Sequence, residues 1–253
     1  MRRRFLGLIF GLVVASCAAV PARAQENAAF QEANHSYRTG DYAKAASLYG
    51  DLITKEPRVA AYYYNLGNAR VRLGQLSAAI LNYEKALLLT PRDQDIRRNL
   101  SHARDLLEYR VEDGRNWYLK TVDASLRYIT QQEALFAVLI VTLVFLLSGI
   151  FCFLRGGGVF WDGWRKALAL LLVLTGLVAF GKHVQQDMIR DAIVTQKECE
   201  ARYGPSEHDQ VAFRMGEGIK LFVVDRREDW SRVLLTNGES GWVKEADIAE
   251  VKI

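Results

Sequence analysis

Residues 134–154 read ALFAVLIVTLVFLLSGIFCFL, a continuous run without a charged side chain. A helix needs about 20 apolar residues to cross the hydrocarbon core of a bilayer, so this run is expected to span a membrane. A second run, ALALLLVLTGLVAF, covers residues 167–180 and is shorter. It is long enough only if the tryptophans and basic residues beside it lie at the membrane interface. These residues are Trp161, Trp164, Arg165, Lys166 and Lys182. We expect transmembrane helices over residues 134–154 and 167–181; the core hairpin of a soluble protein is the alternative.

The start of the chain has the plan of a secretory signal peptide. MRRR is followed by the apolar stretch FLGLIFGLVVASCAAV and by the small-residue site Ala22-Arg23-Ala24, so cleavage is expected after residue 24. Export of the next segment places residues 25–133 on the outer side of the membrane, the loop 155–166 in the cytoplasm and the C-terminus again outside. Residues 14–17, VASC, also resemble a lipoprotein processing box, which would make Cys17 the lipidated residue.

The positive net charge is concentrated in the expected leader. The chain has 33 basic and 29 acidic residues, and four of the arginines precede Gln25 with no acidic residue among them. A processed chain is therefore close to neutral, which excludes a nucleic-acid-binding protein that needs a clustered basic face. The three cysteines are Cys17, Cys152 and Cys199, and only the last lies in a segment expected to be soluble. No intramolecular disulfide framework follows.

Between the leader and the first apolar run, the sequence repeats itself with a period of about 34 residues. The paired positions are Gly40 and Gly74, Ala45 and Ala79, Tyr49 and Tyr83, and Pro57 and Pro91. This period and these residue types resemble the tetratricopeptide repeat (TPR), in which small residues let two helices approach and proline ends the second helix. We expect a TPR domain over residues 25–110, with repeats at 26–59 and 60–93 and a capping helix after them.

The same resemblance assigns a peptide-binding groove to the inner positions of the repeats. These are Asn34 and Arg38 in the first copy and Asn65, Asn68 and Arg72 in the second. An asparagine amide can bind an extended peptide backbone with both donor and acceptor, and arginine can pair with an acidic side chain. The alternative is that these residues are ordinary repeat consensus with a structural role.

Residues 111–133 connect the repeats to the first apolar run. Leu119, Val122, Leu126 and Ile129 recur at helical spacing beside several aromatic residues. Two interpretations remain open for this segment: an amphipathic helix at the membrane interface, or a helix that packs against the core of the repeat domain. Thr130 and Glu133 have the spacing of a capping box, which predicts a helix start just before residue 134.

From Ala192 onward the sequence changes to strand-like patterns. Short β-rich runs at residues 192–195, 211–213, 219–224, 231–235 and 241–243 are separated by the turn signals GEG (216–218) and NG (237–238), which predicts a small barrel. The motifs ARYGPS (201–206), FRMGEG (213–218), DW (229–230) and GWV (241–243) resemble bacterial SH3 domains, expected over residues 192–253. Tyr203, Trp230 and Trp242 are the candidates for a ligand surface, because aromatic faces suit peptide or glycan binding; packing in and around the barrel core is the alternative.

No catalytic site is evident. The four histidines, His35, His102, His183 and His208, have no partner at metal-ligand spacing, and the chain lacks a nucleotide-binding loop, a nucleophile elbow and HExxH or CxxC motifs. We therefore expect a protein that is not an enzyme and has no catalytic residues, no metal and no cofactor.

The order of these parts, with ALLLTP (86–91) running into DIRRNL (95–100), resembles the BatE proteins of bacterial aerotolerance operons over essentially the full length. This implies a multidomain membrane protein with an all-α TPR solenoid, two transmembrane helices and a small all-β SH3-like barrel. It also implies a scaffold in the bacterial inner membrane, with both modules in the periplasm, that acts in stress response with von Willebrand factor A-domain proteins and a MoxR-type AAA+ ATPase. A peptidoglycan-binding anchor that recruits a partner hydrolase is the alternative function.

Overall fold

The structure is a computed structural model that describes residues 28–155, 159–184 and 190–253. The expected signal peptide and Cys17 lie outside these residues. The chain divides between Leu107 and Glu108 into two compact units. We call residues 28–107 the helical unit and residues 190–253 the β-module. The second compact unit contains the β-module together with three helices, α6 (Trp117–Tyr128), α7 (Gln131–Arg155) and α8 (Val159–His183).

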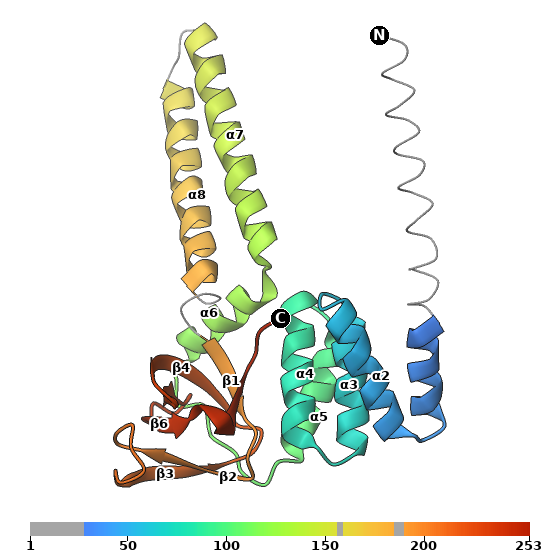
Figure 1. The fold of residues 1–253 in the computed structure, drawn as a ribbon. Helices are drawn as coiled ribbons and strands as arrows, with labels where there is room; N and C mark the ends of the chain where they lie inside the picture. The colour runs from blue at the N-terminus through green and yellow to red at the C-terminus, as the bar shows by residue number, and fades with distance from the viewer. Residues whose placement is uncertain (1–27, 156–158, 185–189) are drawn as a thin grey trace, which may run out of the picture. The chain divides into compact units, whose positions relative to one another are not determined.

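The helical unit is a series of short helices in which each packs against the next (Figure 1). A helix over residues 28–38 is followed by α2 (Tyr42–Lys55), α3 (Ala60–Arg72), α4 (Leu76–Leu89) and α5 (Gln94–Asp105). Asp41 and Asp93 cap α2 and α5 by accepting hydrogen bonds from backbone N–H groups of the first turn. Gly40 and Gly74 follow their helices with φ of +86° and +73°, a backbone conformation that glycine adopts without steric cost.

The core of the helical unit repeats with the sequence. Ala45 and Ala79 are fully buried, and the equivalent tyrosines Tyr49 and Tyr83 are each 1% exposed. Gly67 lets α3 approach α4 closely, because a Cβ at this position would lie 2.6 Å from Cε1 of Tyr83. The period of the sequence therefore corresponds to a period in the packing of the helices.

Two long helices are apolar enough to cross a membrane. These helices are α7 (Gln131–Arg155) and α8 (Val159–His183). The candidate span in α7 is Gln131–Leu154, with a mean hydropathy of 2.9, and the candidate span in α8 is Gly163–His183, with a mean hydropathy of 1.6. The second span has 21 residues, about 31 Å of helix, which matches the roughly 30 Å of a bilayer core. The expected capping box is confirmed, since the Thr130 N–H donates to Glu133 Oε2 and the Glu133 N–H donates to Thr130 Oγ1.

Helix α8 is longer than the sequence indicates. A loop was expected over residues 155–166, yet α7 extends through Arg155 and α8 begins at Val159. Residues 159–166, VFWDGWRK, contain no proline and only one glycine, so nothing in them breaks the helix that the following apolar run forms. The prediction of a long loop was wrong in this respect; residues 156–158 lie outside the described part.

The β-module is a seven-stranded antiparallel sheet in the order β3-β2-β6-β5-β4-β1-β7. The strands are β1 (Arg190–Val194), β2 (Glu198–Arg202), β3 (Val211–Gly216), β4 (Lys220–Arg227), β5 (Trp230–Leu234), β6 (Ser240–Lys244) and β7 (Ile248–Glu250). The five expected runs correspond to β1, β3, β4, β5 and β6. The sequence did not indicate β2, because most of its residues are charged, or β7, which is very short.

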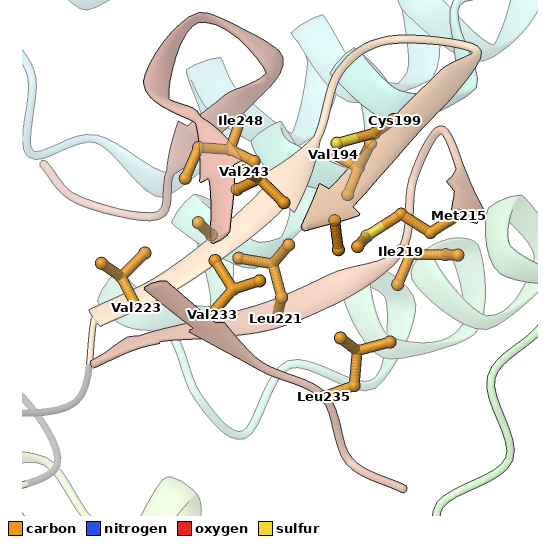
Figure 2. Close-up of a cluster of buried hydrophobic side chains, with 12 residues drawn as sticks. Val194, Cys199, Met215, Ile219, Leu221, Val223, Val233, Leu235, Val243 and Ile248 are labelled. Carbon is orange, nitrogen blue, oxygen red and sulfur yellow. The ribbon is translucent and has the colours of Figure 1, made fainter. Parts of the chain in front are cut away.

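The strands of the β-module enclose one hydrophobic core (Figure 2). Leu221, Val233 and Val243 come from three neighbouring strands and are fully buried, and Figure 2 shows their side chains pointing toward one another. Val111 also packs against this core, although it precedes both candidate spans in the chain. The core of the β-module is thus completed by a residue from the segment before α6.

Candidate functional site

The inner positions of the first repeat form a hydrogen-bond network. The hydroxyl of Tyr49 donates to Asn34 Oδ1 at 2.7 Å, and the amide nitrogen of Asn65 lies 3.4 Å from the same oxygen. Burial of Tyr49 raises the pKa of its hydroxyl to about 12, so it stays a proton donor at physiological pH. The side-chain oxygen of Asn34 therefore links the helix 28–38 to α2 and α3.

The second repeat has the same network one repeat period later. Asn68 Oδ1 accepts from the hydroxyl of Tyr83 at 2.7 Å and from the amide nitrogen of Asn99 at 2.9 Å. Asn99 also donates to the hydroxyl of Tyr64 at 3.1 Å, and burial raises the pKa of Tyr83 above its ordinary value. Asn99 and Tyr64 were not among the expected site residues, although Asn99 stands one repeat period after Asn65. Within the helical unit, the asparagine oxygens thus hold neighbouring helices together.

The two arginines of the expected groove remain exposed. Arg38 is the last residue of the first helix and Arg72 is the last residue of α3, so they occupy equivalent ends of the two repeats. The guanidinium of Arg72 lies 4.8 Å from the ring centroid of Tyr42, which in turn packs edge-to-face against Tyr37. This contact holds one face of the guanidinium and leaves its N–H groups at the surface, where they can bind a carboxylate.

The three aromatic residues expected as a ligand surface of the β-module lie in different environments. Trp230 and Trp242 are on the outer face of the sheet, because their neighbours Ser231 and Val243 point into the core. Trp230 is half-buried, whereas Trp242 is only 7% exposed and lies beside the guanidinium of Arg227, 5.2 Å from the ring centroid. Little of the Trp242 ring is therefore available to a ligand while Arg227 covers it.

Tyr203 is the accessible aromatic residue of the three, at 71% exposed. It begins the loop after β2, and its backbone N–H donates to the carbonyl of Gln210 at 3.1 Å. The guanidinium of Arg202 closes the same loop by donating to the Asp209 carbonyl at 2.7 Å. A Cβ on Gly204 would collide with the carboxylate of Asp209, so a larger residue at this position would require the Asp209 side chain to move. The loop is held by several contacts and presents the Tyr203 ring to solvent.

A cluster of charged residues that the sequence did not indicate joins α6 to the β-module. Helix α6 (Trp117–Tyr128) carries Arg127, whose guanidinium donates to Asp191 Oδ2 in β1 at 2.9 Å. Lys220 of β4 lies 2.8 Å from the same carboxylate oxygen. Burial opposes ionisation of Asp191, but Lys220 and Arg127 outweigh burial and lower its pKa. No local sequence pattern indicates this contact, because both candidate spans separate Arg127 from Asp191 along the chain.

Cys199 has no exposed thiol. It is 1% exposed in the core of the β-module, and burial raises the pKa of its thiol to about 12. Such a thiol stays protonated at neutral pH and reacts poorly with electrophiles. Among the described residues, no group of three His, Cys, Asp or Glu side chains is placed to hold a metal ion.

Comparison with known protein families identifies two parts of the chain. Residues 60–93, which form α3 and α4, match the family model described as a tetratricopeptide repeat. Residues 195–250, which form β2 to β7, match the model described as a bacterial SH3 domain. A comparison with curated proteins found no match. Together these findings indicate a protein that interacts with other proteins or with the cell wall. The chain therefore contains a tetratricopeptide repeat and a bacterial SH3 domain, joined by helices that are long and apolar enough to cross a membrane.

Proposed function

We propose that this chain is a non-catalytic, membrane-anchored scaffold of a bacterial envelope complex. The helical unit binds an extended segment of one protein partner, and the β-module binds a second partner on the same side of the membrane. Helices α7 and α8 cross the inner membrane as a hairpin, and both interaction domains lie in the periplasm.

The observation that carries this proposal is the contact between Arg127 and Asp191. Arg127 precedes the first candidate span and Asp191 follows the second, yet their side chains are 2.9 Å apart. Val111 supports the same conclusion, because it also precedes α7 and packs against the core of the β-module. Two segments that touch must lie on one side of the bilayer, so a chain that enters the membrane through α7 returns through α8. The signal-peptide pattern of the leader supports the periplasm as that side.

The helical unit favours a partner segment with acidic side chains. Arg38 and Arg72 place two exposed guanidinium groups at equivalent ends of consecutive repeats, and each can form paired hydrogen bonds with a carboxylate. The amide nitrogens of Asn34 and Asn68 are the groups of these residues that can still donate to a peptide backbone, because their oxygens already accept hydrogen bonds. An extended peptide with acidic residues matches both features.

The identity of the partners comes from the resemblance of the sequence to the BatE proteins. On that basis the complex contains von Willebrand factor A-domain membrane proteins and is associated with a MoxR-type AAA+ ATPase, and it acts in aerotolerance and in the response to envelope stress. A scaffold of this kind contributes binding and placement, while any chemistry belongs to its partners.

Charge reversal in the helical unit tests the scaffold. The full chain with Arg38→Glu and Arg72→Glu would be expressed in its bacterial host, and proteins that co-purify in mild detergent would be identified by mass spectrometry. We expect the A-domain partners to co-purify with the unchanged chain and to be lost from the double variant. Arg58→Glu is the matched control, because Arg58 is exposed in the turn between α2 and α3. Equal recovery from the double variant and the control would contradict a role of this face, and no A-domain protein with any form would contradict the complex.

The exposed Tyr203 supports a second candidate, a peptidoglycan-binding anchor that recruits a hydrolase. Its ring is 71% exposed on a well-held loop of a domain that matches the bacterial SH3 family. This candidate predicts that the detergent-solubilised chain is retained on purified peptidoglycan, that Tyr203→Ala abolishes retention and that Arg38→Glu with Arg72→Glu does not. The scaffold without wall binding predicts no retention of any of these forms.

A further inference from the structure

One face of α6 is uncovered in the part of the chain that the structure describes. No side chain of this helix is buried, and its most exposed large residues are Trp117 at 78%, Val122 at 54% and Tyr118 at 50%. At about 100° per residue, six residues fall within one arc of roughly 140°: Trp117, Tyr118, Thr121, Val122, Ser125 and Tyr128. We call these six residues the outer face of α6. This face carries three aromatic side chains and, with the tyrosine hydroxyls included, four hydroxyl groups.

The outer face shares only Val122 with the apolar stripe that the sequence indicates. Leu126 and Ile129 belong to that stripe, but both are half-buried. Leu126 packs near α8, where its Cδ1 atom would lie 3.7 Å from a Cβ on Gly181. The structure thus uses part of the stripe for packing inside the second compact unit and leaves the aromatic residues at the start of the helix exposed.

The opposite side of α6 is fixed to the β-module by charge. Arg127 donates to Asp191 of β1, and it also lies 3.1 Å from Asp123 one turn earlier in the helix. Asp123 in turn accepts from Arg115 at 3.3 Å. These groups are among the less exposed residues of the segment. A helix held this way cannot rotate about its axis without breaking the Arg127–Asp191 pair, so the orientation of the outer face is set.

The C-terminal end of α6 lies beside the end of α8 and is followed closely by the start of α7. The ammonium group of Lys182, in the last turn of α8, donates to the carbonyl oxygen of Leu126 at 3.0 Å. Helix α7 begins at Gln131, shortly after α6 ends at Tyr128. The last turn of α8, the first turn of α7 and the last turn of α6 therefore meet in one region. If α7 and α8 cross a bilayer, this region is its boundary with water.

We propose that the outer face of α6 lies in the phospholipid headgroup layer and seats the β-module against the membrane. Tryptophan and tyrosine are enriched at this depth, because their rings are apolar while their N–H and O–H groups still reach water or headgroups. Thr121 and Ser125 suit the same layer, whereas a helix inserted deeper would carry aliphatic residues in their place. The face is also continuous along the chain with α7, and no residue is buried in the most apolar stretch of that helix. The bilayer is thus the surface that covers the exposed rings.

The inference rests on the membrane placement in the proposed function, and spin-label accessibility separates the two. The full chain with Cys17→Ala and Cys152→Ala keeps Cys199, whose thiol is buried. Nitroxides would be attached singly at Tyr118→Cys and Val122→Cys on α6, at Leu143→Cys in α7 and at Tyr203→Cys on the β-module. Each variant would be reconstituted into vesicles of phosphatidylethanolamine and phosphatidylglycerol, and its collision rates with oxygen and with a water-soluble nickel complex would be measured. Circular dichroism would confirm that each variant is folded.

We expect the ratio of oxygen to nickel accessibility at Tyr118 and Val122 to be several-fold higher than at Tyr203 and lower than at Leu143. Ratios at the two α6 positions equal to that at Tyr203, with a lipid-like Leu143, would overturn this inference and leave the membrane anchor intact. A water-like ratio at Leu143 as well would overturn both.

Exclusion of both reagents from the α6 labels would also overturn the inference. Line broadening that disappears on dilution with unlabelled chain would identify a second copy as the cover. The same exclusion without broadening would indicate that α6 packs against another part of its own chain.

Discussion

Replacing Gly67 by alanine tests whether close packing of α3 on α4 defines the helical unit. Its Cβ would lie 2.6 Å from Cε1 and 2.8 Å from Cδ1 of Tyr83, and contacts this short cannot persist without movement. Tyr83 is 1% exposed and its hydroxyl is bound to Asn68, so the ring has no free space into which to turn. Overpacking of this kind costs about 1–3 kcal/mol, while alanine in a helix gains up to ~1 kcal/mol over glycine.

Gly50→Ala is the matched control. Gly50 lies within α2, and a Cβ there meets no heavy atom within 4 Å. Only the helix-propensity gain of ~1 kcal/mol applies, so this variant should be more stable than the unchanged chain. Gly67→Ala should therefore be less stable than Gly50→Ala by about 1–3 kcal/mol.

Hydrogen exchange measured by mass spectrometry on the full chain in detergent reports these differences locally. Peptides from α3 and α4 should exchange faster in Gly67→Ala than in the unchanged chain, and peptides from α2 should exchange more slowly in Gly50→Ala. Gly67→Ala could instead slow hydrogen exchange in α4 as much as Gly50→Ala slows it in α2. The Tyr83 ring would then move aside without loss of stability, and the reasoning would be refuted.

Two further predictions concern buried polar groups. Asn68→Leu should destabilise α4 by about 1–3 kcal/mol, because it leaves the buried Tyr83 hydroxyl without its acceptor. Tyr83→Phe removes that hydroxyl and should cost only about 1 kcal/mol. Equal rates of hydrogen exchange in α4 of the two variants would contradict the network. The pKa of Asp191 is lowered in the folded protein relative to about 3.9 in an unfolded chain, so its pairs with Arg127 and Lys220 stabilise the β-module above roughly pH 4 and this contribution is lost as pH falls through the folded pKa. The melting temperature of Asp191→Asn, followed by near-ultraviolet circular dichroism, should accordingly lie below that of the unchanged chain at neutral pH and approach it in acid; a constant difference would show that the charge of Asp191 is not the cause.

Local patterns in the sequence predicted most of the elements correctly. The regular spacing of Tyr49 and Tyr83 reflects a helical repeat, because each repeat must bury the same positions against the next. The turns at Gly218 and Gly238 have φ of +78° and +95°, which is why glycine marks them in the sequence. Strand β2 was missed because only Cys199 and Ala201 face the core, and alternation over two such residues is a weak signal among charged neighbours.

The candidate sites were harder to predict, because side chains with the same chemistry can serve packing or binding. Asn34 and Asn68 were expected to bind peptide, yet their oxygens accept hydrogen bonds from buried tyrosines of their own repeats. Trp242 was expected at a ligand surface, yet Arg227 lies beside its ring. Only the positions of neighbouring helices and strands determine which polar groups remain available.

The sequence by itself determined the kinds of structure in this chain, which are helical repeats, two apolar spans and a β-rich tail. Each of them can be predicted from residue spacing, because that spacing depends on local backbone geometry alone. The tertiary structure decided how α6 and the β-module meet. Arg127 and Asp191 carry no local pattern that connects them, and their pairing arises because α7 and α8 bring distant segments of the chain to one place. A contact of this kind depends on where whole helices end in space, which no short window of sequence contains.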